Sequence, residues 1–235
     1  MRLRYIYIIA GVVVGVAVVL AVAFCVENSD TKPAIESIYL PAEEESTAMS
    51  SVSDGRISRY DKIFRKEGRR HKIDWRLLAA MAYAESHFNP DAVSSRGAVG
   101  LMQVMPHIAE AFDVPREQLT DVEVNIEVGA RIYRSMMRML QLPKDIDNYD
   151  RMAMTVASYN CGASRVIDAR NLAEYYDDNP NDWSTVSDYL LLLADEEFYD
   201  HEAVQGGRFA RPKMTIAYVE SVMTQYDKYC QRVEE

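Results

Sequence analysis

The sequence predicts an all-α domain that follows an apolar N-terminal helix and a polar tether. From Ile57 onward, apolar residues recur at helical spacing, whereas the alternating pattern typical of β-strands is scarce. Before this region, residues 5–26 form an uncharged run dense in Val, Ile and Ala. A chain of 235 residues can bury one well-packed core. We therefore expect one helical domain at residues 56–235.

Residues 1–26 are predicted to be a transmembrane anchor or a signal segment. A helix of about 20 apolar residues spans the hydrocarbon core of a membrane. Arg2 and Arg4 precede the apolar run, and Glu27 follows it. By the positive-inside rule, the N-terminus stays in the cytoplasm and the domain is extracytoplasmic, on the periplasmic face.

The fate of this segment is open at the level of sequence. Retention of residues 5–26 as a membrane anchor is favoured, because the apolar run exceeds the usual core of a signal sequence. Cleavage after the small residues Ala21–Ala23 and lipid attachment at Cys25 are the alternatives. Residues 27–55 are polar and lack apolar periodicity, which predicts a tether to the domain.

Charge and composition exclude several kinds of partner. Beyond residue 26 the chain has 24 basic and 36 acidic residues. Nucleic acid is therefore not an expected partner, because its binding depends on Lys and Arg at the phosphates. For the same reason we expect the domain to have no basic patch that would hold it against anionic lipid. A weakly charged or neutral polymer is the expected substrate.

Cysteine and histidine spacing indicates no metal site and no cofactor. The three cysteines and four histidines form no C-x-x-C or H-E-x-x-H pattern. In an oxidising compartment Cys161 and Cys230 could form a disulfide. Two unpaired thiols are the favoured alternative, because a disulfide requires a specific geometry.

The helices of the domain are predicted from apolar spacing and capping residues. A first amphipathic helix begins near Tyr60 and is expected to end near Gly68. A second begins at Trp75, with Asp74 as its N-cap. Loops are expected at Asn89-Pro90 and Ser94–Gly100. The further helices are expected at Pro106–Phe112, Val122–Leu140, Tyr149–Asn160, Ala163–Ala173, Trp183–Ala194 and Lys213–Cys230.

Glu85 is the candidate catalytic residue of the second helix. Between Arg76 and Glu85 stand eight uncharged, mostly apolar residues, and a helix apolar on nearly every face is buried. Leu78, Ala82 and Glu85 share one stripe of that helix. A carboxyl group desolvated there should have a raised pKa, as a general acid at a glycosidic bond requires. The alternative is that Glu85 simply marks the point where the helix reaches solvent and ends.

Four sequence blocks, in this order and separation, resemble the catalytic signature of the lytic transglycosylases with a goose-lysozyme-like (SLT) fold. The resemblance covers about residues 60–230 and implies an all-α, lysozyme-like domain. The blocks are Glu85-Ser86, Gly100-Leu101-Met102-Gln103, the segment Ala157–Ala163 around Tyr159-Asn160, and Tyr218 within Thr215–Val219.

The resemblance implies an enzyme that cleaves the glycan strands of peptidoglycan. Glu85 would protonate the leaving oxygen and then act as base, and the C6 hydroxyl of N-acetylmuramic acid would close onto C1 to leave a 1,6-anhydro end. Tyr218 would pack or bond near Glu85. The resemblance also implies that Ser94, Gln103, Tyr159 and Asn160 bind the sugars and that Met105 forms an apolar wall.

Each of these roles has a structural alternative. Met105 and Tyr218 could be core residues, and Gln103 could satisfy loop backbone. Asn160, two residues before Gly162, could mark a helix end.

The resemblance has one large departure and leaves one catalytic question open. Arg151, the triplet Asp168–Arg170 and the spacing Trp183–Val186 are most similar to membrane-bound members of the family, which have a solute-binding-like domain before the catalytic domain. Here only a short tether occupies that place. A two-carboxylate glycosidase needs a second acid; Asp91 and Asp113 are candidates by proximity in sequence, but neither lies in an apolar stretch or a motif.

The sequence is also compatible with three rival functions. A goose-type lysozyme would share the fold and the acid but deliver water to the broken bond. A non-catalytic peptidoglycan-binding module would only tether an assembly to the wall. A membrane-anchored structural protein would use the helices for packing alone, and Gln or Ala would serve equally well at residue 85.

Overall fold

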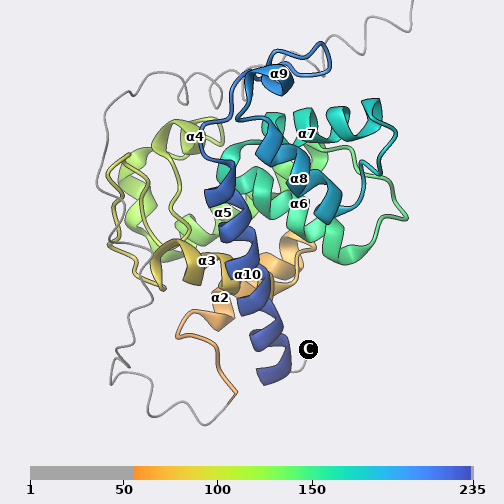
Figure 1. Cartoon of the computed structure of the whole chain (residues 1–235). Coiled ribbons are helices and arrows are strands. Elements are labelled where there is room, and N and C mark those ends of the chain that lie inside the picture. The colour runs from red at the N-terminus through yellow and green to blue at the C-terminus, as the bar shows by residue number, and fades with distance from the viewer. Residues whose placement is uncertain (1–54, 234–235) are drawn as a thin grey trace, which may run out of the picture.

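The computed structural model describes residues 55–233 of the chain (Figure 1). The segments with helical periodicity in the sequence form helices in this part. This part contains no β-strand, only isolated bridges from Val99 to Val93 and to Val104. In chain order the helices are α2 (Asp61–His71), α3 (Trp75–Ser86), α4 (Pro106–Glu110), the 3-10 helix η1 (Arg116–Thr120), α5 (Val122–Met139), α6 (Asn148–Cys161), α7 (Ala163–Tyr175), α8 (Trp183–Leu192), α9 (Glu196–Tyr199) and α10 (Pro212–Arg232). The prediction of an all-α domain is confirmed.

The predicted anchor at residues 1–26 and nearly all of the tether lie outside the described residues. Within residues 55–233, no helix combines the length and the apolar character needed to cross a membrane.

Helix α2 was predicted to end near Gly68, but it continues to His71. Its C-cap is Lys72, which has a left-handed conformation with a φ of 55°. Gly68 is a point of close packing. A Cβ at Gly68 would lie 2.8 Å from the carbonyl oxygen of Ile73 and 3.0 Å from Cβ of Trp75. The glycine therefore serves the contact between α2 and the start of α3, not the end of the helix.

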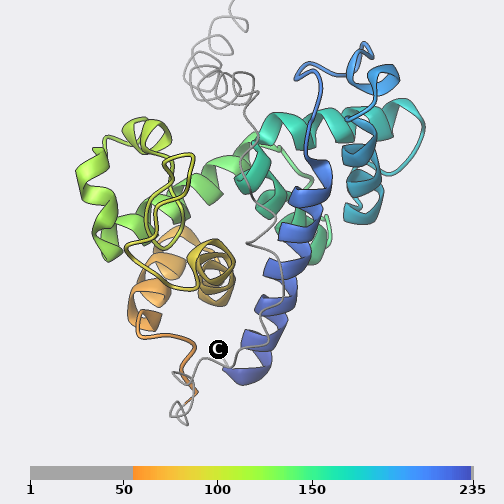
Figure 2. The same cartoon turned by 60° about the vertical axis from the view of Figure 1, so that its left-hand side comes forward.

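Helix α3 is the most deeply buried element, because it is apolar on nearly every side. Asp74 caps it as predicted, with a side chain that accepts a hydrogen bond from the backbone N–H of Arg76. Residues 77–82 are all buried. Both α2 and α10 pack against α3, and Figure 2 shows α10 as the long dark-blue helix along one side of the domain. This burial fixes the last turn of α3, which holds Glu85.

Helices α5 to α8 pack successively against one another, and α10 also contacts α6 and α8. From α4 to α10, the predicted helix ends agree with the observed ends to within two residues. The exceptions are η1 and α9, which the sequence did not predict because such short elements have no apolar periodicity.

Candidate active site

A hydrogen bond joins Glu85 on α3 to Tyr218 on α10. The Tyr218 hydroxyl donates to Oε1 of Glu85 at 2.7 Å. Tyr218 is only 3% exposed and belongs to the hydrophobic core. The two interpretations of Tyr218 are therefore both correct, since its ring packs in the core while its hydroxyl reaches the carboxyl group.

Burial changes the acidity of Glu85. Desolvation raises the pKa of its carboxyl group from 4.5 to about 7, while the hydrogen bond from Tyr218 acts in the opposite direction. By accessible surface the residue is only half-buried. The two observations concern different distances: protein atoms surround the carboxyl group at longer range, yet part of the side chain remains open to solvent. Such a group can hold a proton near neutral pH and still meet an external reactant.

Tyr159 on α6 is a neighbour of this pair. Burial, and to a smaller extent the carboxylate of Glu85, raise the pKa of Tyr159 well above its usual value. The Tyr159 hydroxyl donates a hydrogen bond to the carbonyl oxygen of Met102 at 2.8 Å. Three helices distant in sequence thus bring Glu85, Tyr159 and Tyr218 together.

The loop after α3 is fastened to the end of that helix. The Ser86 hydroxyl donates to the carbonyl oxygen of Leu101 at 2.9 Å. The side-chain amide of Gln103 donates to the carbonyl oxygens of Ala92 at 3.2 Å and Gly100 at 2.9 Å. The nitrogen of this amide therefore supports loop backbone, which was the structural alternative for Gln103.

Asn125 of α5 holds the same loop from within the core. It is fully buried, its Oδ1 accepts a hydrogen bond from the Met102 backbone N–H at 2.8 Å, and its Nδ2 donates to the carbonyl oxygens of Val99 and Leu119, each at 2.9 Å. A Cβ at Gly100 would lie 2.7 Å from Cγ of Asn125. The glycine of the loop and this asparagine therefore fit only as a pair.

Sequence reasoning did not identify Asn125. The available signal was a polar residue on the buried stripe of its helix, three residues after Val122 and four before Gly129. Gly129 lies against the same loop, since a Cβ there would stand 2.8 Å from Cγ of Met102. A buried amide in such a position commonly satisfies loop backbone.

The other predicted site residues lie on the loop and at the end of α6. The hydroxyl of Ser94 accepts a hydrogen bond from the Ala98 backbone N–H at 3.0 Å. Met105 precedes α4, is half-buried and lies outside the hydrophobic core. Asn160 is exposed, and its Oδ1 accepts a hydrogen bond from the Thr215 hydroxyl of α10 at 2.8 Å.

The two candidate second carboxylates are not part of this arrangement. Asp91 and Asp113 are both exposed. Within residues 55–233, no carboxylate contributes to the pKa of Glu85, which responds only to burial and to Tyr218. Glu85 is therefore the sole acidic group at this position in the described part of the chain.

Metal-ligating residues and reactive thiols do not contribute to this arrangement in the part of the chain that the structure describes. The described residues include no cluster of three or more His, Cys, Asp or Glu side chains that could hold a metal ion. Cys161 and Cys230 are both unpaired, as favoured from the sequence. Burial raises the pKa of the Cys161 thiol to about 12, so it is a poor nucleophile.

Comparison with known sequences gives a family match. A family model described as the transglycosylase SLT domain matches residues 62–181. Membrane-bound lytic murein transglycosylase F of Marinobacter nauticus is 36% identical over 174 residues, which are 74% of this chain and 33% of that protein. The protein of the same name from Ectopseudomonas mendocina is 36% identical over 172 residues, 73% of this chain and 34% of that protein. The chain thus spans about a third of the length of the curated relatives it matches.

Solved structures show the same fold. An inactive mutant of the lytic transglycosylase Slt from Pseudomonas aeruginosa superposes with a TM-score of 0.51 at 21% identity, covering 74% of this chain and 24% of that one. The 70 kDa soluble lytic transglycosylase from Escherichia coli gives 0.52 at 23% identity, covering 73% and 24%. At such identities the likeness concerns the fold alone.

Proposed function

The chain belongs to the transglycosylase SLT family, as its motifs predicted, and we propose that it is a peptidoglycan lytic transglycosylase. It cleaves the β-1,4 bond between N-acetylmuramic acid and N-acetylglucosamine and leaves a 1,6-anhydro-muramyl end. The names of its relatives, lytic murein transglycosylases, support this reaction and substrate. The observation that supports it most directly is Glu85, half-buried, with a pKa of about 7 and a hydrogen bond from Tyr218.

The first step uses Glu85 as an acid. With a pKa of about 7, a large fraction of Glu85 is protonated near neutral pH, so it can give its proton to the leaving glycosidic oxygen. As the carboxylate forms, the Tyr218 hydroxyl already donates to Oε1 and stabilises the negative charge. The bond from C1 to the leaving oxygen breaks in this step, and positive charge develops at C1.

The second step uses the same group as a base. The Glu85 carboxylate takes the proton of the C6 hydroxyl, and O6 bonds to C1 of the same sugar, so the cleaved end carries an anhydro ring and no water is added. Well-oriented groups within one molecule reach effective molarities of roughly 10⁵ M or more. No second carboxylate is needed, in agreement with the exposed positions of Asp91 and Asp113.

Substrate contacts are assigned to atoms that the fold leaves available. In the described part of the chain, the side-chain carbonyl of Gln103 and the amide nitrogen of Asn160 have no hydrogen-bond partner, although the opposite end of each amide is fixed. We assign these atoms, with Ser94 and the Tyr159 hydroxyl, to the acetamido and hydroxyl groups of the sugars. Met105, half-buried outside the core, is assigned to an apolar wall.

The proposed location is the periplasmic face of the cytoplasmic membrane, with residues 1–26 as anchor, residues 27–55 as tether and the catalytic domain at 56–235. The flanking Arg2 and Arg4 and the apolar run support this topology. A reporter fused after Glu235 should be active only outside the cytoplasm. Cytoplasmic activity of the fusion would refute the topology without affecting the assigned reaction.

The reaction is tested by digesting purified sacculi and identifying the released muropeptides by mass spectrometry. The products should end in 1,6-anhydro-N-acetylmuramic acid and resist reduction by borohydride. Glu85→Gln should keep the fold and lower the rate by roughly 10²–10⁴-fold, because the transferable proton is lost.

The same experiment distinguishes the rival functions. Mainly reducing ends would identify a goose-type lysozyme, in which water captures C1. Binding to sacculi with no release of muropeptides would identify a peptidoglycan-binding module. Near-normal digestion by a well-folded Glu85→Gln protein would reject Glu85 as the acid.

A further inference from the structure

The charge of the domain is strongly uneven along the chain. Residues 56–76 contain nine basic and three acidic residues, whereas residues 77–235 contain 14 basic and 26 acidic ones. The basic segment forms α2 and the first turn of α3. An acidic protein therefore presents one basic element at the point where the tether joins the domain.

Helix α5 extends this basic region, because its outer face packs beside the end of α2. A surface pocket of about 470 Å³ between the two helices is lined by Arg70, His71, Lys72, Phe112, Arg131, Arg134 and Arg138. The guanidinium of Arg131 lies over the ring of Phe112, 4.9 Å from its centroid. No acidic residue lines this pocket.

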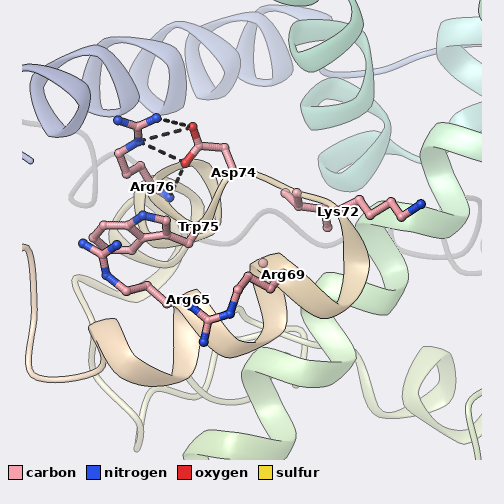
Figure 3. Close-up of a pocket in the computed structure, with 8 residues that line it drawn as sticks. Arg65, Arg69, Lys72, Asp74, Trp75 and Arg76 are labelled. Carbon is pink, nitrogen blue, oxygen red and sulfur yellow. Dashed lines mark hydrogen bonds and ion pairs between the residues drawn. The ribbon is translucent and has the colours of Figure 1, made fainter. Parts of the chain in front are cut away.

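A second pocket, of about 390 Å³, adjoins the first at Lys72 and lies at the opposite end of α3 from Glu85. Figure 3 shows the Arg65 guanidinium over the Trp75 indole, at 3.8 Å from its centroid, and Lys72 extending away from both. Arg76 is joined to Asp74. Together the two pockets form one surface, which we name the α2–α5 basic face.

Most cations of this face have no acidic partner. Arg70 pairs with Glu127 at 2.9 Å, and Arg76 with Asp74 at 2.7 Å. By contrast, the described residues supply no ion pair to six others: Arg65, Arg69, Lys72, Arg131, Arg134 and Arg138. The sequence-based prediction that the domain lacks a basic patch is therefore wrong, because net charge averages over elements that the fold separates.

We propose that the α2–α5 basic face docks the domain on the anionic lipid surface of the membrane to which residues 5–26 attach it. The face spreads its Arg and Lys side chains over two adjoining pockets, and Arg69, Lys72 and Arg138 are exposed, as suits a diffuse layer of headgroups and not one small ligand. It also lies on α2, the helix that the tether enters. A tether of 29 residues (27–55) reaches at most about 100 Å when fully extended, so the membrane is always within reach.

Docking would set the orientation of the active site. Glu85 lies 11 residues after Asp74, about 16 Å along the axis of α3 from the basic face. Because the face includes the start of α3 and Glu85 lies at the other end of that helix, docking would leave the site at the end of α3 that does not contact lipid. The inference depends on the proposed anchor but not on the proposed reaction.

The test uses the full chain in vesicles and its own tryptophans. Trp75 borders the basic face, and Trp183, the other tryptophan, begins α8, which lies away from α2 in Figures 1 and 2. In a Trp183→Phe background, energy transfer from Trp75 to a dansyl-labelled lipid reports approach of this face. Transfer should be greater on phosphatidylcholine vesicles containing phosphatidylglycerol than on phosphatidylcholine alone, and added salt should abolish the difference.

Substitution of the basic face provides the decisive comparison. Each basic residue near an anionic surface strengthens adsorption about five-fold, so the triple variant Arg131→Gln, Arg134→Gln, Arg138→Gln should lower the docking constant at least ten-fold. The matched control removes three exposed charges elsewhere, by Arg208→Gln, Arg211→Gln and Lys213→Gln, and should dock normally. Digestion of soluble glycan chains should be unchanged in both.

Several outcomes would overturn the proposal. Equal transfer on the two kinds of vesicle would do so, as would equal docking by the two triple variants. If the triple variant at Arg131, Arg134 and Arg138 docked normally on vesicles but lost binding to sacculi, the face would recognise an anionic wall polymer and not lipid. Should Trp183→Phe fail to fold, the salt dependence of transfer in the unsubstituted chain gives the same comparison between vesicles.

Discussion

At the scale of single residues, the proton on Glu85 is controlled by two opposed influences. Burial stabilises the neutral acid and raises its pKa to about 7, whereas the Tyr218 hydroxyl stabilises the carboxylate. A general acid that must next act as a base benefits from this balance, because both protonation states are then accessible near neutral pH. Tyr218 is thus expected to adjust the acidity of Glu85 as well as its position.

Tyr218→Phe tests this balance. Removing the hydroxyl removes the hydrogen bond that lowers the pKa of Glu85, so the pKa should rise. The alkaline limb of the pH profile of kcat/KM should move to higher pH. Tyr159→Phe is the matched control, since that hydroxyl donates to the carbonyl of Met102 and not to Glu85. An alkaline limb that stays in place, or moves to lower pH, contradicts this role of Tyr218.

Glu85→Gln should stabilise the domain at alkaline pH. The unfolded carboxyl group titrates near 4.5 and the folded one near 7, so ionisation disfavours the folded state progressively as pH rises between these values. Above pH 7 the penalty is at most about 3–4 kcal/mol, because the shift from 4.5 to about 7 is roughly 2.5 pKa units and each unit corresponds to about 1.4 kcal/mol. Glu85→Gln removes it. Denaturant unfolding should show the variant more stable than the parent at pH 8 and nearly equal to it at pH 4; a constant difference would reject the raised pKa.

The sequence made some of these residues predictable and concealed others. Glu85 stood out as a lone carboxylate in an apolar helix, but its proposed role, like those of Tyr159 and Tyr218, came from the ordered motifs. The hydrogen bonds of Asn125 and of Thr215, which begins the motif around Tyr218, could not be predicted, because each joins a segment distant in sequence. An isolated polar residue on a buried helix face indicates a satisfied side chain but does not identify its partner.

At the scale of elements, the loop between α3 and α4 depends on two glycines and on the close packing of one of them against Asn125. Gly97 and Gly100 have φ angles of 84° and 78°. At Gly97 the nearest atom to an added Cβ is 4.0 Å away, on Arg116, whereas at Gly100 an added Cβ meets Asn125 and the carbonyl oxygen of Leu119 within 2.8 Å. Both glycines relieve backbone strain, but only Gly100 also makes room for a neighbour.

Gly97→Ala and Gly100→Ala are therefore a matched pair. Both introduce a side chain at positive φ, which costs about 1–2 kcal/mol. Gly100→Ala should cost several kcal/mol more in the free energy of unfolding, because Asn125 must shift and its hydrogen bonds weaken. It should also reduce sacculus digestion beyond the loss of folded protein. Equal destabilisation by the two variants, measured by urea unfolding, would show that the loop tolerates displacement of Asn125.

The first residues of α3 and α4 could be predicted from the sequence, whereas the last residue of α2 could not. Asp74 and Pro106 begin their helices as expected, since capping and first-turn proline are local effects. Gly68 did not end α2, because its meaning depends on the contact with Trp75. A glycine in sequence indicates either a turn or close packing, and only the tertiary arrangement separates the two.

At the scale of the whole molecule, α10 closes the domain by bonding to both ends of α3. Tyr218, early in α10, bonds to Glu85 at the end of α3, and Tyr226, later in α10, donates to Oδ2 of Asp74 at its start, at 2.9 Å. The reversed order shows that the two helices run antiparallel. The same helix therefore stabilises the fold and completes the site, and the two contributions can be separated by comparing its two tyrosines.

Tyr226→Phe should destabilise the domain without changing the acidity of Glu85. It removes one hydrogen bond to an ionised carboxylate, which typically contributes 1.5–3 kcal/mol, so the free energy of unfolding should fall by about 1–2 kcal/mol for this partly buried pair. Despite opposing desolvation, the bonds from Arg76 and Tyr226 hold the pKa of Asp74 below 3.8; their contribution is present above that pH and is lost as pH falls through the folded pKa. The destabilisation should therefore shrink in acid. Unlike Tyr218→Phe, this variant should leave the alkaline limb of the kcat/KM profile unchanged, because its partner lies about 16 Å along α3 from Glu85. If Tyr226→Phe moved that limb as far as Tyr218→Phe does, the hydrogen bond at Glu85 would have no specific effect on its acidity, and α10 would act on the site only by holding the fold together.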